Sequence, residues 1–125
     1  MKTSKNNQFE AENKAWEKSL EFIKQENALL KYRLSEMVDY SDEKDFLQMA
    51  EYFQNELLLK DDALDKLIKE LKNFPDKING QNDNENAEKI LYEHDKLRNK
   101  MAQLEEEFSQ LSNEFNREML KNSKH

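Results

Sequence analysis

Apolar residues recur at alternating intervals of three and four, and this spacing constrains the fold more than any other feature. In residues 9–37 one apolar series advances in steps of seven, and Leu20 and Leu34 belong to a second, interleaved series. Such a pattern places apolar side chains on one face of an α-helix. Residues 46–71 and 87–115 repeat it, so the chain is expected to contain three amphipathic helices.

We predict an all-α fold in which helices at about 8–38, 42–73 and 84–121 form an elongated three-helix bundle or antiparallel coiled coil. The chain contains one Gly and one Pro, which excludes a many-stranded β fold. Charged residues make up 38% and apolar residues 36% of the 125 residues, a balance that suits a slender bundle better than a compact sphere. Residues 1–125 are expected to form a single helical domain.

The two predicted breaks between helices differ in their sequence signals. Residues 74–83 contain Pro75, Gly80 and several Asn and Asp residues, which predicts a polar loop with the second helix ending near Asn73. Residues 39–43 lack both Pro and Gly, but Ser41 is a good N-cap residue. A tight turn is favoured there, and one long helix with a stutter stays open. Residues 1–7 and 122–125 are expected to be disordered tails.

Three polar residues interrupt the apolar seams, namely Asn27, Lys60 and His94. The structural interpretation is that Asn27 specifies register, Lys60 extends its ammonium group to the bundle edge and His94 bonds to a polar neighbour. The alternative places all three at one level, where they would form a polar core site for a small ligand or a metal.

A second set of apolar and aromatic residues falls beside the seams. Ala15, Phe22 and Leu29 are seven residues apart, so they widen the apolar stripe on one flank of the first helix. A stripe of that width predicts that the first helix touches two neighbours rather than one. Because the seams are thin for a stand-alone monomer, the peripheral apolar residues also predict a second interface, either in a homodimer or with another helical protein. The candidate interface residues are Phe22, Leu29, Tyr32, Leu47, Tyr52, Leu58, Ile68, Leu91 and Tyr92.

The functional expectation is a non-enzymatic protein–protein interaction or structural module that self-associates. The chain lacks Cys, and we find no nucleophile, metal-ligand or phosphate-loop motif, so no catalytic residue, metal ligand or cofactor is predicted. A net charge of −7 argues against nucleic acid as a partner. The aliphatic runs are too short for a membrane span, and a cytoplasmic location is expected.

Residues 16–34, WEKSLEFIKQENALLKYRL, resemble the opening of small bacterial helical proteins that have no assigned activity. Residues 50–56 resemble the second helix of the same group. The resemblance implies a helical fold, and it implies no activity and no functional residues.

Overall fold

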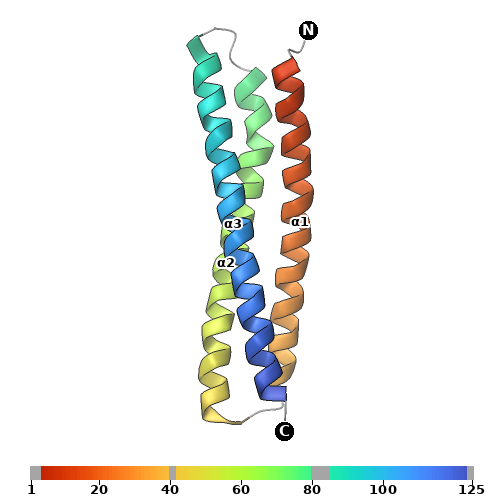
Figure 1. The fold of residues 1–125 in the computed structure, drawn as a ribbon, viewed down its shortest axis with the longest axis vertical. Coiled ribbons are helices and arrows are strands. Elements are labelled where there is room, and N and C mark those ends of the chain that lie inside the picture. Colours follow the sequence, from red (N-terminus) through yellow and green to blue (C-terminus); the bar gives the residue numbers. More distant parts are fainter. Residues whose placement is uncertain (1–3, 40–41, 80–84, 124–125) are drawn as a thin grey trace.

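The computed structural model describes residues 4–39, 42–79 and 85–123, and these form three helices packed against one another. Helix α1 spans Ser4–Asp39, α2 spans Lys44–Asn79 and α3 spans Glu85–Ser123. The helices alternate in direction, with α1 and α3 parallel and α2 antiparallel to both (Figure 1). No strand occurs in the described ranges. The predicted all-α three-helix bundle is therefore confirmed.

Most of the core consists of the apolar rows that the spacing predicts, and Ile68, Phe74 and Met119 are buried in addition to them. Its buried members are Phe9, Leu20, Ile23, Leu30 and Leu34 in α1, Phe46, Ala50, Phe53, Leu57, Leu64, Leu67, Ile68, Leu71 and Phe74 in α2, and Leu97, Met101, Leu104, Phe108, Leu111, Phe115 and Met119 in α3. Trp16, Met37 and Ile90 are partly buried against this core, whereas Ala87, assigned to the third seam, is exposed. Burial of these side chains is the main favourable contribution to folding.

The first break is a connection between two helices, so the alternative of one continuous helix through residues 39–43 is wrong. Helix α2 begins at Lys44, and the carbonyl oxygen of Glu43 accepts a hydrogen bond from the backbone N–H of Leu47 at 3.0 Å. Asp45 places a negative charge in the first turn, where it interacts favourably with the helix dipole. The predicted N-cap residue Ser41 lies outside the described residues.

The second helix ends later than predicted, because it continues through Pro75 to Asn79. A proline removes one backbone hydrogen bond and disfavours the α conformation of the residue before it. Here that residue is Phe74, which is buried against Phe9, with ring centroids 6.1 Å apart, and against His94, at 5.1 Å. This packing holds Phe74 in the helix and offsets the lost hydrogen bond, so the predicted loop 74–83 is wrong for residues 74–79.

The helices extend into both predicted tails, so the prediction of disorder is wrong for residues 4–7 and 122–123. Helix α1 begins at Ser4 and α3 continues to Ser123. Residues 1–3, 80–84 and 124–125 lie outside the described part of the chain, together with the remainder of the predicted tails and loop.

Candidate functional site

An open groove lies between α1 and α3 on the surface of the bundle. Helix α1 packs less extensively against α3 than against α2, and the space left between α1 and α3 is about 590 Å³. The lining residues are Lys18, Ser19, Phe22, Ile23 and Glu26 from α1 and Glu105, Phe108, Ser109, Ser112 and Asn113 from α3.

The groove is open because small side chains stand where larger ones would fill the space. Ser19, Ser109 and Ser112 line it, and beneath them Ile23 and Phe108 belong to the core and are each only 8% exposed. The groove therefore has an apolar floor and a polar rim. This composition is typical of a site that receives an apolar side chain or a helix face.

Two arginine side chains connect α1 to α3, one beyond each end of the groove. Toward the N-terminus of α1, Glu12 accepts hydrogen bonds from α3. Nη2 of Arg98 donates to both of its carboxylate oxygens, at 3.1 and 2.9 Å. Near the other end, Nη1 of Arg33 donates to Oδ1 of Asn116 at 3.4 Å. Glu12 and Arg33 are about 32 Å apart along the helix at 1.5 Å per residue. The groove lies between these two contacts.

An exposed apolar row on α1 includes Phe22, which lines this groove. We call Ala15, Phe22 and Leu29 the outer row, because each is exposed and each is seven residues from the next. Phe22 is 62% exposed and Leu29 is 49% exposed, although both side chains are large and apolar. In the described part of the chain no helix covers the outer row, although α1 contacts both α2 and α3.

Seven of the nine candidate interface residues are exposed, and they are Phe22, Leu29, Tyr32, Leu47, Tyr52, Leu58 and Tyr92. The prediction is wrong for Ile68, which is buried in the core, and Leu91 is partly buried against the core. Because α2 contacts both other helices, its buried stripe is wider than a two-position seam and includes Ile68. Leu59 and Leu120 are also exposed, although the spacing did not mark them as interface residues.

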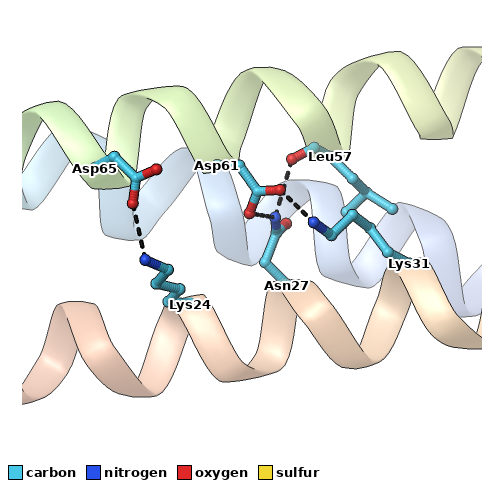
Figure 2. A network of polar contacts seen from close by, with 6 residues as sticks. All are labelled: Lys24, Asn27, Lys31, Leu57, Asp61 and Asp65. Atoms are coloured by element: carbon cyan, nitrogen blue, oxygen red, sulfur yellow. Dashed lines mark hydrogen bonds and ion pairs between the residues drawn. The ribbon is translucent and has the colours of Figure 1, made fainter.

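Asn27 is fully buried between α1 and α2 and forms the centre of a polar layer (Figure 2). Its Nδ2 donates to the carbonyl oxygen of Leu57 at 2.9 Å and to Oδ1 of Asp61 at 2.7 Å. Lys31 donates to the other oxygen of Asp61, and Lys24 donates to Asp65 one turn along at 2.9 Å. Since all these contacts join α1 to α2, the layer fits the predicted register role of Asn27.

Lys60 lies at a similar level but faces α3. Its Nζ donates to Oε2 of Glu107 at 3.0 Å, while its own side chain is only 15% exposed. Hydrogen bonds from Lys60 and then from Gln103 lower the pKa of the Glu107 carboxyl below its usual range. The geometry matches the expected behaviour of Lys60, with a buried stem and an ammonium group at the bundle edge.

His94 lies in an aromatic cluster between the three helices, and its side chain is fully buried. Its ring centroid is 4.1 Å from that of Phe9, 4.9 Å from that of Trp16 and 5.1 Å from that of Phe74. With Nε2 protonated, the ring donates to Oδ1 of Asn13 at 3.1 Å, and Nδ1 has no hydrogen-bond partner among the described residues.

Burial lowers the pKa of His94 below its usual value, because the apolar surroundings disfavour the charged imidazolium. Among the nearby charges, Glu12 on α1 opposes this shift, Arg98 on α3 adds to it and Asp95 on α3 opposes it. The α2 side chain against the ring is that of Phe74, which carries no charge. His94 is therefore neutral near pH 7.

The three polar seam residues do not form one site. His94 bonds to Asn13, which precedes Asn27 by fourteen residues, or about 21 Å along α1. The alternative of a shared ligand site using Asn27, Lys60 and His94 is wrong for this geometry. Asn13 was missed in the sequence, although it stands seven residues before Leu20 in the same seam row.

Comparisons with known proteins add no family or relative. A scan of family models finds no match, and searches of curated proteins and of solved structures also find none. In the described residues no group of three or more His, Cys, Asp or Glu side chains is placed to hold a metal ion. None of the described helices has a stretch long and apolar enough to cross a membrane.

Proposed function

We propose that this chain is a non-enzymatic protein–protein interaction module that binds an amphipathic helix in the groove between α1 and α3. The observation that carries the proposal is the exposure of Phe22 beside that groove. A large aromatic side chain left in water at the edge of an apolar-floored groove is a typical contact residue of a helix-binding surface. A bound helix would cover Phe22 and Leu29 and make the bundle four-helical.

The length of α1 between the two arginine contacts supports a helix as the occupant. The Arg98–Glu12 and Arg33–Asn116 contacts leave about 32 Å of α1 between them, which corresponds to about six helical turns. The serine-rich rim allows the backbone of a bound helix to approach closely, and the charged groups Lys18, Glu26 and Glu105 border the apolar floor. An apolar centre with a charged rim is the usual composition of a specific interface.

The test is site-specific photocrosslinking in cells that naturally contain the protein. A benzophenone amino acid replaces Phe22 in one variant and Tyr92 in a matched control. These two aromatic residues are almost equally exposed, at 62% and 60%. The proposal predicts a discrete covalent adduct from position 22 and none from position 92. Absence of an adduct from position 22, or equal adducts from both positions, contradicts it.

A further inference from the structure

We infer that the helix bound in the α1–α3 groove is α1 of a second copy of this chain, packed antiparallel about a two-fold axis at Phe22. This inference rests on the proposed function, since it names the helix that the groove binds. Three features of the outer row and its flanks carry it: a charge pattern that is complementary to itself, a size pattern that is complementary to itself, and a length that fits between the two arginine contacts.

The charge pattern centres on Phe22. Lys18 precedes Phe22 by four residues and Glu26 follows it by four, and both line the groove. When two copies of α1 cross antiparallel at Phe22, Lys18 of each copy faces Glu26 of the second copy. The symmetry therefore forms two oppositely charged pairs from one sequence. In the described residues neither Lys18 nor Glu26 belongs to an ion pair within the chain, so both charges are available.

The size pattern has the same centre. Ala15 precedes Phe22 by seven residues and Leu29 follows it by seven, and both are exposed. The antiparallel pairing packs the large Leu29 of each copy against the small Ala15 of the second copy. Phe22 then meets Phe22 of the second copy above the floor formed by Ile23 and Phe108. Alternation of large and small side chains across the contact fills the interface without steric overlap.

A parallel pairing in register lacks both advantages. It would place Lys18 against Lys18 and Glu26 against Glu26, and like charges in contact are destabilising. It would also pair Leu29 with Leu29 and leave a gap between two Ala15 side chains. The contact from Ala15 to Leu29 is about 21 Å long, so it fits within the stretch of α1 between Glu12 and Arg33 and extends beyond both ends of the groove lining. The antiparallel arrangement therefore satisfies charge, size and length together.

Charge reversal tests the geometry directly in the purified chain by sedimentation equilibrium. The wild type should show a reversible monomer–dimer equilibrium. Lys18→Glu and Glu26→Lys should each raise the dimer dissociation constant by about tenfold or more, because each turns both attractive pairs into repulsive ones. An equimolar mixture of Lys18→Glu and Glu26→Lys chains should form a 1:1 dimer with the wild-type dissociation constant, since every pair is again of opposite charge.

Matched controls are Lys89→Glu and Glu88→Lys, which make the same charge changes at exposed α3 positions more than fifteen residues before the groove lining on that helix. These two variants should dimerise as the wild type does, and circular dichroism should show all variants equally helical. Failure of the mixture to recover the dimer, or equal weakening by the control pair, overturns the antiparallel geometry.

A wild-type chain that stays monomeric at millimolar concentration overturns the second copy as the occupant. In that case the crosslinking experiment still tests whether the groove binds a helix of another protein. An adduct from position 22 with a different protein retains the helix-binding function, whereas an adduct with twice the mass of the chain agrees with the dimer.

Discussion

Leu29 and Leu30 are adjacent leucines on α1 that have opposite environments. Leu30 is 3% exposed and packs in the core beside the polar layer of Asn27, whereas Leu29 is 49% exposed on the outer row. Both belong to seven-residue series, with Leu30 following Ile23 and Leu29 following Phe22. Identical side chains with identical spacing are therefore used once for folding and once, in our proposal, for binding.

This comparison shows what a seven-residue spacing can and cannot establish. The spacing determines which residues share a face of a helix, because each heptad step returns to nearly the same side. It does not determine which faces the rest of the chain covers. The three-helix bundle covers the inner row of α1, and the outer row stays exposed.

The largest predicted effect comes from truncating the two leucines separately. Leu30→Ala should lower the free energy of unfolding by about 2–5 kcal/mol, because it leaves a cavity in the core. Leu29→Ala should change it by less than about 0.5 kcal/mol at dilute, monomeric concentrations. Urea denaturation followed by circular dichroism measures both. Similar losses for the two variants would show that α1 is rotated relative to this structure.

Asn27 and Gln25 allow the same comparison of a buried and an exposed side chain on α1, here for polar residues. Asn27→Ala should lower the free energy of unfolding by about 1–3 kcal/mol, because it removes the hydrogen bond to the partly buried carboxylate of Asp61. Gln25→Ala, two residues away on the exposed side of α1, should have an effect below about 0.5 kcal/mol. Urea unfolding of both variants compares them. An unchanged midpoint for Asn27→Ala would remove its register role.

The pH dependence of the free energy of unfolding reports on the burial of His94 in its aromatic cluster. Because burial lowers the pKa of His94 in the folded chain, the unfolded chain binds a proton first as the pH falls below about 6.5. The free energy of unfolding should then fall by up to about 1.4 kcal/mol per pH unit until the folded His94 is itself protonated. Unfolding at pH 7.0, 6.5, 6.0 and 5.5, a range chosen to lie above the usual carboxyl pKa values, measures this slope.

Two variants define the origin of that slope. A double variant, Asn13→Leu with His94→Leu, removes both hydrogen-bonding partners and should abolish it, and His125→Gln, the change at the only other histidine, should retain it. A slope that persists in the double variant would assign the effect to other groups.

The smallest predicted effect concerns the ion pair at the edge of the bundle. Lys60→Met keeps the apolar stem but removes the charge that faces Glu107, so stability should change by no more than about 1 kcal/mol. The pKa of Glu107 should rise toward its usual value, because its strongest hydrogen-bond donor is lost. Carbon-detected NMR titration of the carboxyl group checks this. An unchanged pKa would mean that Lys60 and Glu107 do not interact in solution.

The helices and most of the core could be predicted from the sequence, because a regular seam depends only on local spacing. The end of α2 could not, since the packing of Phe74 against Phe9 and His94 joins residues far apart in the chain. The partner of Asn27 was missed for the same reason, because Asp61 occupies an ordinary charged position in a different helix.

The candidate site was predicted only in part. Phe22 and Leu29 were recognised from their spacing, but the groove beside them depends on Ser109 and Ser112 of α3 lying across from Ser19 of α1. No single segment of sequence contains that arrangement. Ile68 was wrongly predicted to be an interface residue because its burial depends on how many helices pack against α2. That number is set by the arrangement of the whole bundle and cannot be read from the sequence of α2.

The central claim is that α1 buries one apolar row within the chain and presents the other to a partner. Because the chain has no cysteine, the single variants Leu29→Cys and Leu30→Cys each carry one thiol, whose reaction rate with a disulfide reagent reports its exposure. At dilute concentration the thiol at position 29 should react rapidly and the thiol at position 30 slowly. The rate at position 29 should also fall as protein concentration rises. Equal rates at the two positions, or faster reaction at position 30, would contradict the claim.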